Sequence, residues 1–302
     1  MKKFKKIIRA VLVLAVLAGL IYLIPKVITV VCLKRAADSY VAASSVSTFK
    51  DSKTTMIYET NDQELCTMKN TKDMYYVSYQ EIPVTLVNSF VVMEDRQFYK
   101  HSGYDIKAIL RAIVINQKSN DIAQGASTIT QQLARNIFLS QEVTWQRKVE
   151  EIFIAVGLEK KYSKNQILEF YLNNIYFGNG YYGVEAAARG YFDKSVSELT
   201  LAEQTFIAAI PNNPTRYNPL TNYDNTVQRK NLILQQLYEA DDIGSLDRYM
   251  AETEEVVLNP HQTEEINNSV VTYARHCATE SLMSVSGFTF RYNFSSEDDY
   301  NA

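Results

Sequence analysis

The sequence predicts a mainly α-helical domain behind a single N-terminal membrane-spanning helix. From Ile82 onward apolar residues recur at helical spacing nearly throughout, and Ser163-x-x-Gln166 and Thr200-x-x-Glu203 are capping boxes that open helices. At the N-terminus a basic segment precedes a long apolar run. The chain has 302 residues, of which 46% are hydrophobic and 22% charged, which suits one sizeable globular core plus appendages.

The N-terminal segment divides into a cytoplasmic basic part, residues 1–9, and the predicted anchor, residues 10–33. Residues 10–24 carry no charge, and with Ile7, Ile8 and residues 27–33 the run can cross a bilayer core of about 30 Å. Five cations before the run predict a cytoplasmic N-terminus, with the remaining chain on the other side of the membrane. A cleaved signal peptide is the alternative, because small residues occur at 41–43. The anchor is favoured, since that cleavage point lies far beyond the run.

Residues 34–79 are polar and rich in Ser, Thr and Lys, which is typical of a juxtamembrane linker. Strand-like pieces at 54–58 and 74–77 predict one hairpin there at most. Cys32 lies in or beside the anchor, whereas Cys66 and Cys277 lie outside it, and nothing requires them to pair. A net charge of −3 argues against nucleic acid as a partner.

The next predicted helix, residues 83–94, ends on a candidate catalytic carboxylate. Pro83 suits its first turn, and Leu86, Val87, Phe90 and Val91 form one apolar stripe. Glu94 follows Phe90 by one helical turn, so it continues the apolar face. A carboxylate held there loses hydration and becomes a usable proton acceptor near neutral pH. The ordinary alternative is a Glu at a helix end that turns outward to water.

Three more helices follow, and each presents polar groups. Asp105 caps a helix with Arg111 off its apolar stripe, and Ser127 is the predicted cap of the next. Thr144 caps a helix whose predicted buried stripe is Trp145, Val149, Ile152, Phe153 and Val156. On that helix Arg147 precedes Glu151 by four residues, which is also the spacing of an ordinary surface ion pair. Joining a sugar hydroxyl to an anomeric carbon needs a base and, for a departing phosphate, cations or a metal, and residues 94–151 supply carboxylates and cations.

Five ordered blocks carry a family resemblance. They are E-D-x-x-F-x-x-H-x-G-x-D from Glu94 to Asp105, G-A-S-T-I-T-Q-Q-L-A-R-N at 125–136, R-K-x-x-E at 147–151, and the stretches 162–178 and 191–219. Together they resemble the peptidoglycan glycosyltransferases, glycosyltransferase family 51. Those domains occur alone or at the front of class A penicillin-binding proteins. The resemblance covers roughly residues 80–245, and five blocks in order make a chance match improbable.

The resemblance implies a lysozyme-like, two-lobed helical domain at residues 80–258, with one lobe dipping into the membrane, followed by a connector-like tail at 259–302. It implies polymerisation of lipid II into β-1,4-linked glycan with inversion and release of undecaprenyl diphosphate. The implied partners are lipid II, the growing lipid-linked glycan, the membrane and other cell-wall synthesis proteins. Glu94 would be the base, and Glu151 would position the diphosphate, directly or through a divalent cation, Mg²⁺ or Mn²⁺.

The remaining site residues are assigned by matching position. The basic set that would neutralise the leaving group is Arg111, Arg135, Arg147 and Lys148. The set that would bind sugars and phosphates is Asp95, Phe98, His101, Gly125, Ser127, Thr128, Gln131, Gln132 and Asn136. Glu169, Asn173 and Tyr176 are weaker candidates, for which packing is an equal interpretation.

Three positions depart from the family pattern. Ala126 replaces a usual Gly, which restricts the backbone there, and Arg135 replaces a usual Lys. Val143 stands where Arg is common, which removes one cation. Activity is expected to survive these changes with altered affinity.

Two other functional classes remain open. A lysozyme-like hydrolase would also use an embedded Glu, although it would need neither the basic cluster nor an anchor. A non-catalytic scaffold of the wall-synthesis machinery is the second alternative, because of the departures.

The ends of the sequence bear on transpeptidation. Residues 268–294 look like the connector that leads to a transpeptidase, so the chain is either a one-activity enzyme or part of a two-activity protein. Ser47-x-x-Lys50 matches a transpeptidase nucleophile motif without its partner motifs, and chance explains it better. No β-lactam acylation is expected.

Overall fold

The structure, a computed structural model, describes residues 2–50, 55–59, 64–68, 73–118, 127–140, 142–260 and 289–292. The α-helices are α1 (Lys2–Ala43), α2 (Val84–Glu94), α3 (Ile106–Lys118), α4 (Ile129–Phe138), α5 (Trp145–Lys161), α6 (Lys164–Asn174), α7 (Val184–Phe192), α8 (Leu201–Ala208), α9 (Tyr223–Glu239) and α10 (Ser245–Thr253). The strands are β1 (Thr55–Glu59), β2 (Glu64–Met68), β3 (Asp73–Met74), β4 (Tyr181–Tyr182) and β5 (Thr289–Tyr292). The mainly α prediction is confirmed.

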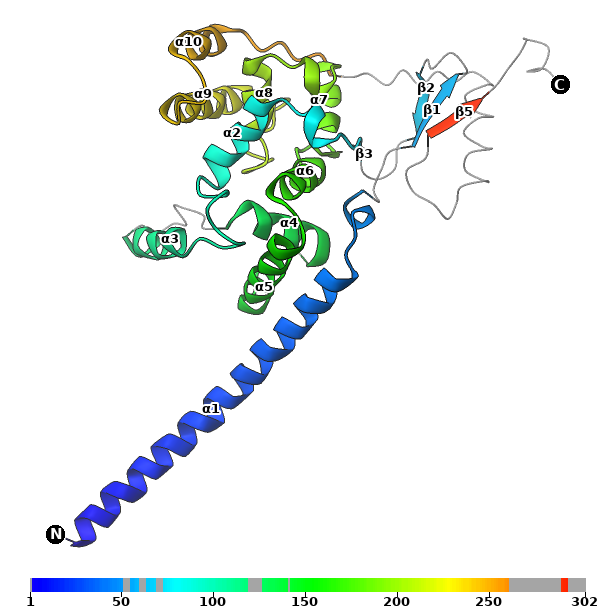
Figure 1. The fold of residues 1–302 in the computed structure, drawn as a ribbon. Coiled ribbons are helices and arrows are strands. Elements are labelled where there is room, and N and C mark those ends of the chain that lie inside the picture. Colours follow the sequence, from blue (N-terminus) through cyan, green and yellow to red (C-terminus); the bar gives the residue numbers. More distant parts are fainter. Residues whose placement is uncertain are drawn as a thin grey trace.

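Helix α6 lies between two groups of helices (Figure 1). On one side α4 and α5 pack together and against α6, and on the other α2, α8 and α9 pack with one another and α9 with α10. One hydrophobic core joins both groups. Across it the ring of Tyr171 on α6 meets the ring of Phe90 on α2 edge to face, with centroids 5.9 Å apart. The end of α2 therefore faces the helices that carry the second to fourth sequence blocks.

Most of the predicted helix starts are confirmed. Asp105 Oδ1 accepts from the backbone N–H groups of Lys107 and Ala108, and Thr144 accepts from that of Arg147. Both predicted capping boxes are present at α6 and α8. The prediction for α4 was wrong by one residue, because its N-cap is Thr128. The hydroxyl of Ser127 instead accepts a hydrogen bond from Lys148 Nζ, so it is not available to the helix.

In two helices, α5 and α3, the residues that are buried differ from those that the apolar pattern predicts. In α5 the buried residues are Glu151, Ile154, Ala155 and Leu158, so the predicted stripe through Trp145 was wrong. Trp145 is half exposed at the start of that helix. The buried face includes a carboxylate, and a search for apolar periodicity cannot assign such a residue to the core. In α3 the predicted apolar stripe is Ile106, Ile109, Leu110 and Ile113. It also points partly outward, since Ile106 and Leu110 are exposed.

The juxtamembrane linker contains one hairpin, but its second strand is Glu64–Met68 and not the predicted piece at 74–77, since β3 pairs with β4. Strands β1 and β2 pair antiparallel, and β5, from the C-terminal tail, pairs parallel with β1 on its other edge. The end of the linker docks on α6, where Tyr76 Oη donates to Glu169 at 2.6 Å and Asn173 accepts from the Val77 backbone at 2.9 Å. Glu169 and Asn173 thus hold the linker on α6, and these contacts agree with the interpretation that the two residues serve packing.

Helix α1 runs without a break into the domain and packs along α5 (Figure 1). Ala37 is buried, and Gly157 of α5 lies so close to Val41 that a Cβ there would come within 2.8 Å of Val41 Cγ2. Lys161 Nζ donates to the carbonyl of Val41 at 2.7 Å and also to that of Ser44. A lysine at the C-terminal end of a helix satisfies carbonyls that lack an intrahelical partner.

Within the described residues, no helix is both long enough and apolar enough to cross a membrane. Part of the predicted anchor at 10–33, residues 10–18 and residue 20, lies outside the residues whose side chains are described. It therefore stays a prediction.

The contact between α1 and α5 gives a direct test. We expect Gly157→Ala to lower the free energy of unfolding by about 1–2 kcal/mol, because overpacking against the stiff Val41 outweighs the helix propensity gained. Adding Val41→Ala should return most of that loss. Chemical unfolding in detergent measures both variants. A stabilised Gly157→Ala would show that α1 does not pack on α5.

Candidate functional site

A polar cavity of about 670 Å³ lies where the end of α2 meets the start of α3, the start of α4 and α9. Its wall includes Glu94, Arg111, Ser127, Thr128 and Gln236. Four of these belong to the predicted site, so the fold brings together residues from the first two sequence blocks and the helix between them.

Glu94 ends α2 with its side chain mostly out of water, since only 17% of it is exposed. Gln132 Nε2 donates to Glu94 Oε2 at 2.9 Å, and Arg229 Nη2 lies 3.9 Å from Glu94 Oε1. The amide occupies one carboxylate oxygen, while the other oxygen faces a cation at longer range. Glu94 thus lies beside the cavity and not in bulk water. Its role as the base stays a prediction.

Glu151, in contrast, is buried and neutralised by two cations. Its side chain is 1% exposed, with Arg147 Nε 3.0 Å from Oε1 and Lys148 Nζ 2.7 Å from Oε2. Lys148 also donates to Ser127 Oγ at 2.7 Å and to Gln131 Oε1 at 3.1 Å. A buried carboxylate requires such partners. The pair of Arg147 with Glu151 is therefore not an ordinary surface ion pair.

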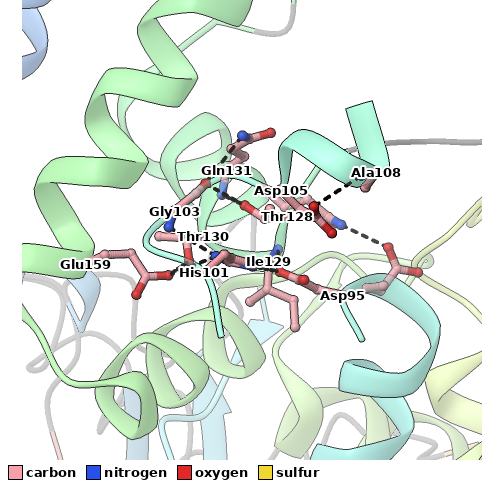
Figure 2. Close-up of polar contacts among 12 residues, drawn as sticks. Asp95, His101, Gly103, Asp105, Ala108, Thr128, Ile129, Thr130, Gln131 and Glu159 are labelled. Atoms are coloured by element: carbon pink, nitrogen blue, oxygen red, sulfur yellow. Dashed lines mark hydrogen bonds and ion pairs between the residues drawn. The ribbon is translucent and has the colours of Figure 1, made fainter. Parts of the chain in front are cut away.

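The carbonyl of Gly103 fixes the start of α4 (Figure 2). It accepts from Thr128 Oγ1 at 2.9 Å and from Gln131 Nε2 at 3.3 Å. Gly103 has φ +102°, and a Cβ there would come within 2.8 Å of the Ala155 backbone, so this close approach requires glycine. The glycine of the first block thus sets the position of two polar residues of the second.

Asp95 and His101 form hydrogen bonds to the backbone of the same turn (Figure 2). His101 Nδ1 accepts from the Gly103 N–H at 3.1 Å, which leaves the ring proton on Nε2 to be donated to Asp95 Oδ2 at 2.8 Å. Asp95 Oδ2 also accepts from the N–H of Ile129. Both side chains are buried, and direct substrate contact by His101 stays a prediction.

The other predicted residues lie at varied depth. Phe98 is fully buried, with Lys164 Nζ 4.2 Å from its ring centroid. Arg111 is exposed, Asn136 is exposed on α4, and Arg135 is partly buried. Their roles as substrate contacts stay predictions.

The three departures are placed differently. Ala126, with the predicted Gly125, lies outside the described residues. Val143 is 90% exposed, so the absent cation would have stood on the surface before α5. Arg135 Nε is buried without a hydrogen-bond acceptor among the described residues.

Sequence reasoning missed Arg229 on α9. Its guanidinium lies over the ring of Tyr217 at 5.0 Å, and its Nε is buried without an acceptor in the described part of the chain. The buried face of α9 contains Thr226, Ile233 and Leu237. Arg229 falls on that face by helical spacing, and a cation within a buried stripe is the signal that could have identified it.

The residues present offer little to a metal ion. Among the described residues, no group of three or more His, Cys, Asp or Glu side chains could hold one. Mg²⁺ in proteins commonly uses one or two carboxylates together with substrate phosphates. Both oxygens of Glu151 already contact Arg147 and Lys148, so a metal there would have to displace a cation.

Comparison with known proteins identifies the family of the chain. The transglycosylase family matches residues 61–238. The chain is 43% identical over 215 residues to penicillin-binding protein 4 of Bacillus subtilis, covering 71% of this chain and 34% of that protein. It is 43% identical over 198 residues to penicillin-binding protein 1A of Aquifex aeolicus, covering 66% and 25%. The corresponding protein of Escherichia coli is 42% identical over 203 residues, covering 67% and 24%.

Glu94, with 17% of its side chain exposed, lines the polar cavity, and Ser127 of the same wall accepts from Lys148, which holds the second carboxylate, Glu151. Acids and cations in this combination suit an anionic substrate. The chain belongs to the transglycosylase family. It spans about a third or less of the length of these relatives. A crystal structure of penicillin-binding protein 1A from Haemophilus influenzae aligns with a TM-score of 0.43 at 20% identity, covering 80% of this chain and 26% of that one. The lysozyme-like arrangement stays a prediction.

The role of Lys148, which contacts Ser127, Gln131 and Glu151, can be tested against a matched ion pair elsewhere in the domain. We expect Lys148→Met to lower the free energy of unfolding by about 1–2 kcal/mol, because a buried carboxylate loses one of two cations. Glu151→Gln in the same chain should recover part of that stability. Chemical unfolding measures both changes.

The control is Lys194→Met. Lys194 pairs with the buried Glu203 at 2.6 Å and is exposed to the same extent as Lys148, 40%. It should cost similar stability and leave transglycosylase activity near wild type, whereas Lys148→Met should lower that activity about 100-fold. Equal activity of the two variants would contradict a role for Lys148 at the site.

Proposed function

We propose that this chain polymerises lipid II, a disaccharide carried on a lipid diphosphate, into β-1,4-linked glycan. The observation that supports it most is Glu94: a mostly buried carboxylate with one oxygen held by Gln132, the other near Arg229, at the wall of a polar cavity. Membership of the transglycosylase family supports the same reaction.

In the proposed reaction Glu94 acts as the base. Oε2 already accepts from Gln132, so Oε1 takes the proton from the 4-hydroxyl of the acceptor sugar. The oxygen of this 4-hydroxyl forms the new bond to the anomeric carbon of the donor glycan. The bond between that carbon and the diphosphate breaks, with inversion at the carbon. The electron pair leaves with undecaprenyl diphosphate, and the proton stays on Glu94 until water or leaving group removes it.

The diphosphate requires positive charge. Lys148 and Arg147 lie beside Ser127 and Glu151, and Glu151 holds both cations in place. Arg135 and Arg229 each have a buried Nε–H without an acceptor among the described residues. Buried donors are rarely left unpaired, so these two suit an anionic ligand. Such preset charges stabilise a leaving group without reorganisation.

The lipid substrate and the predicted anchor both place the domain at a membrane. Exposed apolar side chains on and before α3 and α5 support this: Tyr104, Ile106, Leu110, Val143 and Trp145. Figure 1 shows α3 and α5 at the end of the domain from which α1 extends. Exposed apolar groups of this kind commonly mark membrane or protein contacts. We propose a single-pass protein of the bacterial cell membrane with its catalytic domain outside.

The base assignment predicts that Glu94→Gln abolishes polymerisation. We expect the rate with purified lipid II to fall at least about 100-fold, because the amide cannot take the proton while the shape of the site is kept. Gel analysis of labelled glycan measures it. Glu252→Gln on α10 is the control carboxylate and should polymerise like the wild type.

The products and a growth assay separate the alternatives. Soluble muropeptides in place of polymer would favour a lysozyme-like hydrolase. Equal restoration of growth by wild type and Glu94→Gln in a transferase-deficient cell would favour a scaffold.

The occupied carboxylate of Glu151 predicts a weak dependence on divalent ions. We expect polymerisation in excess EDTA to keep at least about a third of its rate, because Arg147 and Lys148 supply the positive charge that a metal would otherwise bring. Rates with EDTA, added Mg²⁺ and added Mn²⁺ measure it. Loss of all activity in EDTA, recovered by Mg²⁺, would show that a metal takes part.

A further inference from the structure

We propose that Tyr171 is a positioning residue for the base, acting through Gln132; the inference rests on the proposed function. Tyr171 Oη donates to Gln132 Oε1 at 3.2 Å, and Gln132 Nε2 donates to Glu94 Oε2 at 2.9 Å. The three side chains come from α6, α4 and α2, so one hydrogen-bonded line joins the centre of the domain to the carboxylate.

The hydrogen bonds along this line can run in only one order, from Tyr171 through Gln132 to Glu94. An amide has an acceptor end and a donor end, and an ionised carboxylate can only accept. If the Gln132 amide turned over, its oxygen would face the Glu94 oxygen and its NH₂ group would face the Tyr171 hydroxyl. The carboxylate, which can only accept, sets the direction of the amide, and the phenol, by donating to the amide oxygen, holds the amide in that position.

The phenol can keep this role throughout the working pH range. Tyr171 is buried, and this burial, together with the nearby charge of Glu94, raises the pKa of its hydroxyl well above the ordinary value. Tyr171 therefore stays a neutral donor. Its ring is fixed as well, because it meets Phe90, one turn before Glu94 on α2, edge to face.

The consequence for the reaction is the choice of oxygen. With Gln132 on Oε2, Glu94 presents Oε1 to the acceptor hydroxyl, and the carboxylate cannot rotate freely. A base must lie within hydrogen-bond reach of the proton it takes, and small displacements lower the rate strongly. Tyr171 touches neither substrate nor base, so it changes turnover and not substrate affinity.

The test is Tyr171→Phe in polymerisation of purified lipid II. We expect kcat to fall about tenfold with KM within about twofold, because only the orientation of the base is lost.

The matched control is Tyr191→Phe. Tyr191 is also fully buried, and its hydroxyl donates to the carbonyl of Phe177 at 2.8 Å and accepts from Asn179. It should lower the thermal midpoint about as much as Tyr171→Phe and leave kcat near wild type.

A second variant keeps the test independent of folding. Gln132→Leu breaks the same line at its middle, so adding Tyr171→Phe to it should lower kcat no further. Equal kcat for Tyr171→Phe and Tyr191→Phe, or additive losses in the double variant, would overturn the proposal. A wild type that makes no polymer at all would instead overturn the proposed function.

Discussion

The start of α4 determines the geometry of the site, because its consecutive residues Gln131 and Gln132 interact with two different carboxylates, one through a lysine and one directly. Gln132 donates to Glu94, whereas Gln131 accepts from the Lys148 ammonium that holds Glu151. Successive helical residues point about 100° apart, so a single turn can reach two walls of a site. The Gly103 carbonyl, through Thr128 and Gln131, fixes where this turn begins. A shift of α4 would therefore move the partners of both carboxylates together.

The two carboxylates are held in opposite ways, and this divides their roles. Glu151 is buried with a cation on each oxygen, so its charge is fully used in ordering Arg147 and Lys148. Glu94 has a single close donor and a cation at longer range, so one oxygen remains for chemistry. Two acids in one site commonly differ in function because their surroundings differ. Under the proposed function, Glu151 would place the positive charge and Glu94 would take the proton.

Sequence patterns predicted what depends on local spacing. The caps at Asp105 and Thr144, both capping boxes and the placement of Glu94 at the end of α2 are local, and they are present. Long-range pairing was not visible: Arg229 and Tyr171 come from helices outside the first three blocks. The buried stripe of α5 was missed because the core includes Glu151, whose charge is matched by Arg147 and Lys148 of the same helix. Family resemblance named the site residues, but depth and partners came from the fold.

The packing of α1 on α5 links the site to the proposed anchor. Gly157 lies against Val41, and Lys161 reaches the carbonyls at the end of α1, so the two helices run side by side in the same sense. Glu151 lies about 9 Å before Gly157 along α5, and Arg147 and Lys148 lie a further turn back. The cations therefore stand on the side of α5 nearer the membrane, if residues 10–33 span it. A lipid diphosphate has its charge at the bilayer surface, so under the proposed function these cations would meet the leaving group there while Glu94 would act on the sugars above it.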